Sequence, residues 1–262
     1  MKTLQTIWQE LFQPLSAFGY EKGQGTTRLS WSKPFLEAQQ YLRRYGEAIG
    51  LQCRRDSWGN LLMTVPGETD LPPVYTGSHL DSVPHGGKYD GALGITVPLA
   101  IAAAWHEKGF RPCRPLTIIA FAEEEGTRFG TPCLGSQAIA GKLQGKDPDS
   151  FVTAEGRTLS QLLREAGLEG DPFAPHLLPG KCFLEFHIEQ GRALEDAKLP
   201  LGIVSAIVGI RHFTVTITGT ANHAGTTAMK DRKDALVAAA RWISTVFEKA
   251  LASQRQYVAT VG

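Results

Sequence analysis

The sequence has few cysteines and no closely spaced pair of them. Its 262 residues include four cysteines, Cys53, Cys113, Cys133 and Cys182. The absence of a C-x-x-C spacing argues against a thiolate metal site or a thiol redox motif. We therefore predict reduced, mostly buried thiols rather than disulfides.

Long apolar runs and an excess of one charge are also missing. No window approaches the roughly 18 apolar residues of a membrane span, and Met1–Gln13 lacks the apolar core of a signal peptide. The formal net charge of +1 gives no reason to expect a nucleic-acid or membrane-surface partner. We predict a cytoplasmic protein with neither partner. Because apolar residues make up 42% of the chain, a sizeable core can be buried.

Helical and strand patterns alternate along the first two hundred residues. A helix is predicted over Ser32–Gly50, opened by a cap and an early proline. A second helix, Gly91–Lys108, is apolar nearly all round and is predicted to be buried. Leu116–Ala122 is a continuous apolar strand, typical of a sheet covered on both faces. Further strands are predicted at Leu51–Arg55, Leu61–Val65, Val74–Ser78 and Phe183–Ile188, and a helix after the capping box Thr158–Gln161. The alternation predicts an α/β sandwich with a mostly parallel sheet.

A second unit is predicted in the last part of the chain. Arg211–Gly219 alternates polar and apolar residues, which indicates a half-exposed strand. A helix is expected over Asp231–Ala250 and another strand over Tyr257–Val261. We therefore predict one domain over residues 1–209 and the start of another over 210–262.

Side chains that favour metal ions occur where the predicted strands end, the edge at which such sheets place their sites. His79 and Asp81 are two residues apart and would point the same way on an extended segment. The carboxylate could then brace an imidazole that binds metal through its other nitrogen. Asp90, at the start of an apolar helix, offers an oxygen ligand.

Three adjacent carboxylates, Glu123–Glu125, directly follow the buried strand. Such a run of negative charges is costly unless cations neutralise it. Because it directly follows a buried strand, the alternative, a solvated helix start, is disfavoured. His187 and Glu189 alternate along a predicted strand and would share a face. Spacing alone leaves His187 open as a ligand or an ordinary strand residue, and His223 as a site residue or a loop histidine. The layout is that expected of a two-metal hydrolase.

Five motifs, in this order, resemble the hydantoinase/carbamoylase branch of the M20 metallopeptidase-like amidohydrolases. They are Gly77-Ser-His-Leu-Asp-Ser, Tyr89-Asp-Gly, Ala122-Glu-Glu-Glu-Gly-Thr-Arg-Phe, Phe186-His-Ile-Glu-Gln-Gly and Asn222-His-Ala-Gly-Thr-Thr. The branch holds N-carbamoyl-L-amino-acid hydrolases, allantoate amidohydrolases and β-ureidopropionases. The resemblance covers essentially the whole chain. Because relatives continue further, it predicts an N-terminal portion that lacks the C-terminal third of the family.

The resemblance implies a role for each matching residue. Implied ligands of two divalent ions (zinc, or manganese, cobalt or nickel) are His79, Asp90, Glu125 and His187, with Asp90 bridging. Glu124 matches the general base, Asp81 the carboxylate behind His79, and Gln190 and His223 substrate contacts. The implied fold is a zinc-peptidase-like three-layer sandwich with an inserted α+β lid and dimerisation domain, incomplete here. A homodimer is implied for the full-length enzyme.

The activity implied by the resemblance is hydrolysis of the ureido C–N bond of N-carbamoyl-L-amino acids. The products are an amino acid, ammonia and carbon dioxide. A ureido carbonyl is a poor electrophile because two nitrogens donate into it, and two cations would polarise it. Allantoate amidohydrolase and β-ureidopropionase activity remain alternatives. So do an M20 peptidase or aminoacylase, against which His187 argues, and an inactive truncated fragment.

Overall fold

The structure, a computed structural model, describes residues 2–174, 179–254 and 257–262. The chain folds as two compact units, Met1–Leu199 and Pro200–Gly262. The assignment of residues 1–209 and 210–262 to a catalytic and a lid domain stays a prediction.

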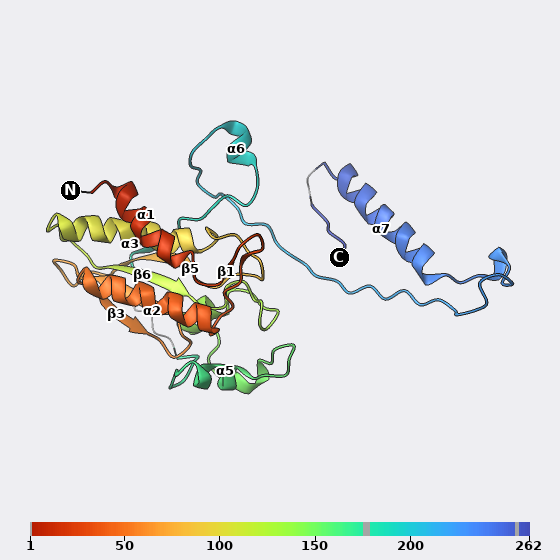
Figure 1. Ribbon diagram of the computed structural model, residues 1–262, viewed down its shortest axis with the longest axis horizontal. Coiled ribbons are helices and arrows are strands. Elements are labelled where there is room, and N and C mark those ends of the chain that lie inside the picture. Colours follow the sequence, from red (N-terminus) through yellow and green to blue (C-terminus); the bar gives the residue numbers. More distant parts are fainter. Residues whose placement is uncertain (1, 175–178, 255–256) are drawn as a thin grey trace. The chain divides into compact units, whose positions relative to one another are not determined.

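A five-stranded sheet lies at the centre of the first unit (Figure 1), with the strand order β3-β4-β6-β5-β7. Its strands are β3 (Gln52–Arg55), β4 (Leu61–Val65), β5 (Val74–His79), β6 (Leu116–Phe121) and β7 (Cys182–Leu184). The predicted α/β class is confirmed, but the sheet is mixed rather than mostly parallel. The pairs β3–β4 and β4–β6 are antiparallel, whereas β6–β5 and β5–β7 are parallel.

The connection between β3 and β4 explains the antiparallel edge. Oδ1 of Asp56 accepts hydrogen bonds from the backbone N–H groups of Gly59 and Asn60, both at 2.8 Å. This closes a tight turn, and strands joined by a short turn must run in opposite directions. Parallel pairing begins only where longer connections intervene, as between β5 and β6.

Three helices, α1 (Leu4–Leu15), α2 (Lys33–Ala48) and α3 (Ala92–Glu107), share the main core with the sheet. Successive residues of a strand face opposite sides, so Leu61 and Met63 of β4 join this core. The other face has a smaller buried cluster, which consists of Leu62, Tyr75, Ile119, Phe121 and Ile139, the last from α4 (Leu134–Ile139). Both faces are therefore covered, as the apolar run of β6 predicted.

Helix α1 is absent from the sequence-based prediction. The hydroxyl of Thr3 accepts from the N–H of Thr6 at 3.1 Å and caps the helix. Leu11 and Leu15 are fully buried. Their four-residue spacing was the available signal, diluted by the polar residues between them. The remaining short elements of the first unit are β1 (Tyr20–Glu21), β2 (Gly25–Thr26), the 3-10 helix η1 (Pro148–Ser150), α5 (Leu159–Glu165) and α6 (Ala193–Ala197). The capping box predicted for α5 is present.

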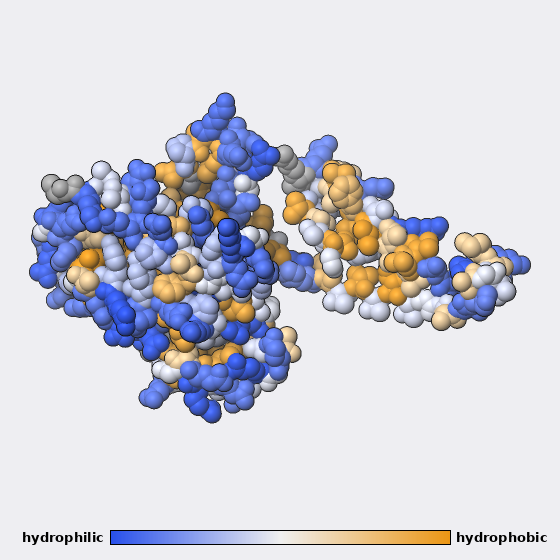
Figure 2. Space-filling view, in the orientation of Figure 1, coloured by the Kyte–Doolittle hydropathy of each residue, from blue (hydrophilic) through white to orange (hydrophobic). Residues whose placement is uncertain are grey.

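The second unit contains one long helix, α7 (Ala235–Ala252), and a short 3-10 helix, η2 (Met229–Asp231). The predicted helix is confirmed, although it begins at Ala235, after the cap Asp234. The strands predicted over Arg211–Gly219 and Tyr257–Val261 were wrong, since no strand occurs in the described part of this unit. Apolar side chains are exposed on α7 (Figure 2); they include Leu236, Val237, Ile243, Phe247 and Leu251.

The cysteines and the lengths of the helices bear on the predictions made from composition. All four cysteines are free, as predicted, but Cys113 and Cys182 are exposed rather than buried. None of the helices in the described ranges combines the length and apolarity needed to cross a membrane.

Candidate metal centre

His79 is the last residue of β5 and is 3% exposed. Its Nδ1 lies 2.9 Å from the backbone carbonyl oxygen of Asp81, which leaves Nε2 to face the site. Burial lowers the pKa of His79, but the carboxylates of Asp90, Asp81 and Glu124 outweigh it and raise the pKa to about 9. The surroundings of His79 thus favour positive charge, on either a proton or a metal ion.

Asp90 lies between two histidines at the start of α3. Its Oδ1 is 3.5 Å from Nε2 of His79 and 3.2 Å from Nε2 of His187. Contact with His187, and then with His79, holds the pKa of Asp90 well below its usual range. Contact with Asp90 in turn raises the pKa of His187. Gly91 permits this approach, because a Cβ there would lie 2.6 Å from ring atoms of His79.

The donor set fits a divalent metal ion. One ligand atom from each of His79, Asp90 and His187 lies within 4.8 Å of the others, the one such group found in the described residues. Oδ1 of Asp90 is buried and accepts no hydrogen bond of acceptable geometry from a described residue. A buried carboxylate oxygen that accepts no well-formed hydrogen bond is costly unless a cation satisfies it. Imidazole nitrogens and carboxylate oxygens are ligands that zinc accepts.

Asp81 does not brace His79 through its carboxylate as predicted. The bond to Nδ1 of His79 comes from the backbone carbonyl of Asp81, while its carboxylate accepts from the N–H groups of Glu124 at 3.2 Å and Glu125 at 3.1 Å. The prediction assumed an extended segment, but β5 ends at His79, so the two-residue periodicity does not reach Asp81. Asp81 therefore ties the acidic run to the end of β5.

The three adjacent glutamates differ in their surroundings. Glu123 is fully buried and has a positive φ of 61°. Its N–H donates to Oγ of Ser30, and its Oε1 accepts from the N–H of Arg128. Burial, and then the charge of Asp81, raises the pKa of Glu123 to about 7. Sequence reasoning gave this residue no separate role.

Glu124 and Glu125 lie closer to the histidines. Oε2 of Glu124 is 3.8 Å from Nε2 of His79, and its Oε1 accepts from Sγ of Cys133 at 3.4 Å. The side chain of Glu124 is 36% exposed, so water can reach it. Glu125 is half-buried, and burial is the largest cause that raises its pKa. Its carboxylate is outside the group formed by His79, Asp90 and His187, and its role as a ligand stays a prediction.

The two predicted substrate contacts lie in different units. Nε2 of Gln190 donates to Oδ2 of Asp90 at 3.3 Å, which places Gln190 beside the metal-binding group. In the second unit, Nδ1 of His223 accepts from the N–H groups of Gly225 at 3.1 Å and Thr226 at 3.2 Å. This pattern leaves the proton of a neutral imidazole on Nε2 of His223.

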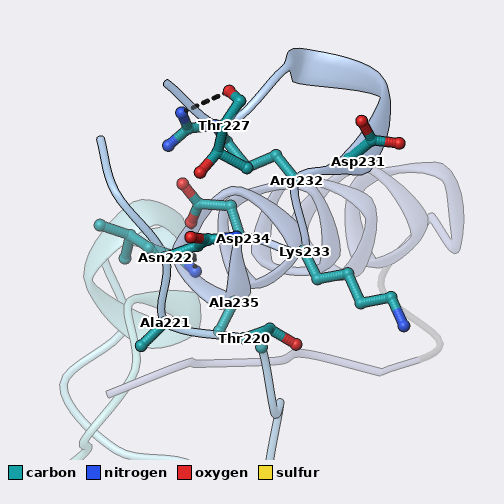
Figure 3. Close-up of a pocket in the computed structure, with 11 residues that line it drawn as sticks. Thr220, Ala221, Asn222, Thr227, Asp231, Arg232, Lys233, Asp234 and Ala235 are labelled. Carbon is teal, nitrogen blue, oxygen red and sulfur yellow. Dashed lines mark hydrogen bonds between the residues drawn. The ribbon is translucent and has the colours of Figure 1, made fainter. Parts of the chain in front are cut away.

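The second unit also contains a cavity of about 380 Å³ that sequence reasoning did not find (Figure 3). It lies at the start of α7, and its lining includes Asn222, Thr227 and Arg232. Arg232 donates to the carbonyl oxygens of Ala224 at 2.7 Å and Thr227 at 3.0 Å. None of the lining residues is a predicted metal ligand.

The first unit is thus an α/β domain in which a mixed sheet places a histidine–carboxylate group beside the end of β5. Residues 60–159 match the family model Peptidase family M28, a segment that contains His79, Asp90 and Glu123–Glu125.

Full-length relatives give a closer assignment. The chain is 39% identical to an N-carbamoyl-L-amino acid amidohydrolase of Geobacillus stearothermophilus, with 94% of this chain and 61% of the relative covered. It is 38% identical to an allantoate amidohydrolase of Escherichia coli K12, with 97% and 62% covered. A solved hydantoinase/carbamoylase family amidase from Burkholderia ambifaria matches with a TM-score of 0.77 and 30% identity, over 99% of this chain and 64% of that one. The chain thus spans about three-fifths of the length of these relatives, and over nearly all of its own length it is similar to hydantoinase/carbamoylase family enzymes.

Proposed function

We propose that the protein is a metal-dependent amidohydrolase that cleaves the ureido C–N bond of N-carbamoyl-L-amino acids. The products would be an L-amino acid, ammonia and carbon dioxide. The observation that carries the proposal is the approach of His79 and His187 to the buried Oδ1 of Asp90, which accepts no well-formed hydrogen bond from a described residue, with Glu124 beside them. The similarity to an enzyme named for this reaction supports the choice of substrate class.

Two divalent ions would be held by His79, Asp90, Glu125 and His187, with Asp90 shared between them. Zinc is the first candidate, and manganese, cobalt and nickel accept the same ligand types. When bound, such ions polarise a carbonyl and lower the pKa of water.

Glu124 is the residue we assign to proton transfer. Its carboxylate is partly exposed and lies beside His79, so it can accept a proton from water and deliver it to the leaving nitrogen. Asp81 supports this role, because its carboxylate binds the backbone N–H groups of both Glu124 and Glu125. A rigid backbone at this point keeps the carboxylate of Glu124 in place.

Gln190 and His223 are the proposed substrate contacts. Gln190 already hydrogen-bonds Asp90, so its amide is held next to the proposed reacting centre. The free Nε2–H of His223 would donate to a substrate oxygen. We further propose that residues 1–209 form the catalytic domain and that 210–262 begin a lid through which the full-length, cytoplasmic protein forms a homodimer.

Allantoate is the second candidate substrate. The identity to the Escherichia coli allantoate amidohydrolase, 38%, is almost the same as the 39% identity to the carbamoyl-amino-acid enzyme. Allantoate and N-carbamoyl-L-amino acids both carry a ureido group, so the same histidines and carboxylates could act on either substrate.

A substrate panel tests the proposal. Purified protein is stripped with a chelator, reloaded separately with zinc, manganese, cobalt or nickel, and given N-carbamoyl-L-amino acids, allantoate, or an N-acetyl amino acid. We expect metal-dependent ammonia release from the N-carbamoyl compounds, and none from the Glu124→Gln protein. Ammonia release from allantoate alone would make allantoate the substrate in place of N-carbamoyl-L-amino acids. Hydrolysis of the N-acetyl compound alone would contradict a ureido substrate.

A further inference from the structure

His187 lies in a segment that the sheet does not hold. Strand β7 pairs with β5 from Cys182 to Leu184, and no ladder in the described part of the chain continues beyond Leu184. Nevertheless, Nε2 of His187 lies 3.2 Å from Oδ1 of Asp90. The sequence had suggested a strand up to Ile188, which would have fixed His187 through backbone pairing. Other contacts must therefore fix its position.

A side-chain hydrogen bond replaces the missing ladder. Oγ of Ser78 donates to Oε1 of Glu185 at 2.6 Å. Ser78 is 1% exposed and immediately precedes His79, whereas Glu185 is two residues before His187. A hydrogen bond to a carboxylate is shorter and stronger than one between neutral groups. This bond extends the link between the two segments beyond their last paired residues, Thr76 and Leu184, toward the two histidines.

Gly94 allows the same segment to approach α3. A Cβ at Gly94 would lie 2.7 Å from Cβ of Ser78, and closer still to the carbonyl oxygen of Phe186. Real Cβ atoms do not tolerate such contacts with backbone, so a side chain at this position would displace Phe186 or the helix. Since Asp90 lies just before α3, any such displacement would separate His187 from Asp90.

We propose that Ser78, Glu185 and Gly94 form a latch that positions His187 as a metal ligand. The inference rests on the proposed metal centre. Ser78 belongs to β5, Glu185 to the segment after β7 and Gly94 to α3. Their contacts hold these parts together at Glu185 and Phe186, the two residues before His187. They are positioning residues, because they act through His187 and none of them is a proposed ligand or substrate contact.

The test is zinc affinity of the purified protein, measured by competition with a chelating dye and without any turnover. We expect Ser78→Ala, Glu185→Ala and Gly94→Ala each to weaken zinc binding by about 10- to 100-fold, the usual effect of removing a group that orients a ligand. Gly87→Ala is the matched control, because no atom lies within 4 Å of the added Cβ, and it should bind like the parent. If Gly94→Ala fails to fold, the exposed Glu185 still gives a variant that leaves the core intact.

A double variant shows whether Ser78 acts by positioning His187 or has a general structural role. In the His187→Ala background, Ser78→Ala should cause no further loss of zinc affinity, since the ligand that it positions is gone. A further loss of similar size would overturn the latch. If Ser78→Ala and Glu185→Ala both bind zinc like the parent while His187→Ala binds it more weakly, the latch is overturned and the metal centre stands. Parent-like binding by His187→Ala itself would overturn both.

Discussion

The two units of the chain differ in how completely they bury their apolar residues. The first unit has a continuous core in which Leu11, Leu99 and Ile118 are fully buried. In the second unit, none of the described residues is buried, and Leu236 and Phe247 of α7 are 79% and 61% exposed. Both units nevertheless have the apolar patterns from which elements were predicted.

The difference shows which elements depend on neighbours. Helix α7 forms without a buried face, because the hydrogen bonds of a helix lie within the helix, and Asp234 caps two N–H groups at its start. A strand has no internal hydrogen bonds, so the alternating pattern of Arg211–Gly219 produces no strand without a partner. In the first unit, the predicted strands β4, β6 and β5 do form, because they pair with one another.

The largest expected effect lies in the chemistry of the first unit. Glu124→Gln should reduce turnover by about 10²- to 10⁴-fold, because an amide cannot accept the proton. Its zinc content, measured by atomic absorption, should stay at the parent level. Glu125→Gln should instead reduce zinc content. Near-normal turnover by the Glu124 variant would remove Glu124 as the base.

Core truncation compares the two units directly. Leu99→Ala removes a fully buried side chain in α3 and should lower the free energy of unfolding by about 2–5 kcal/mol. Leu236→Ala, in α7, removes a 79% exposed one and should change it by less than about 0.5 kcal/mol. Urea denaturation followed by tryptophan fluorescence measures both. Equal losses would mean that α7 has a buried partner.

The metal-free protein should lose stability as the pH rises. The pKa of His79 in the folded protein is about 9, above its ordinary value of 6.5. The stability gained from its protonation is therefore fully present below pH 6.5 and is lost as the pH rises to 9. The buried Glu123, with a pKa of about 7, acts in the same direction between pH 4.5 and 7. We expect a decline on the order of 2 kcal/mol between pH 6.5 and 9.

Urea midpoints across this pH range measure the decline. His79→Gln should remove most of it, whereas His212→Gln, an exposed residue of the second unit, should leave it unchanged. An increase in stability with pH in the parent protein would contradict the charge environment described for His79.

Helix caps should give the smallest effect. Thr158→Ala removes the hydroxyl that accepts from the N–H of Gln161, one of the two hydrogen bonds in the capping box of α5, and should lower the free energy of unfolding of the first unit by about 1 kcal/mol. Asp234→Ala removes the cap of α7 and should instead reduce helical circular dichroism, with no change in the unfolding midpoint of the first unit. A shift of that midpoint by Asp234→Ala would show that the two units unfold together.

Sequence reasoning predicted the elements whose pattern is local. Strand β4 begins and ends at the predicted residues, and α2 and α3 lie within the predicted ranges. Helix α1 was missed because its apolar residues are interrupted by polar ones. The direction of β3 and β4 was missed because it depends on the turn at Asp56 and not on strand composition.

The site was predictable in part. The motifs singled out His79, Asp90 and His187, and these three residues do come together. Asp81 was correctly predicted as the partner of His79, but it binds Nδ1 through its backbone carbonyl and not its carboxylate, because β5 ends before Asp81. Contacts between distant segments, such as Ser78 with Glu185, leave no periodic signal in a single sequence, since neither residue type nor spacing identifies the partner.

The central claim is that His79, Asp90 and His187 bind a metal ion. Crystals of the zinc-loaded protein, measured at the zinc absorption edge, test it directly through the anomalous difference map. The account predicts a peak about 2.0–2.2 Å from Nε2 of one or both histidines and from a carboxylate oxygen of Asp90. Zinc bound elsewhere, with Oδ1 of Asp90 still without a cation, would contradict it.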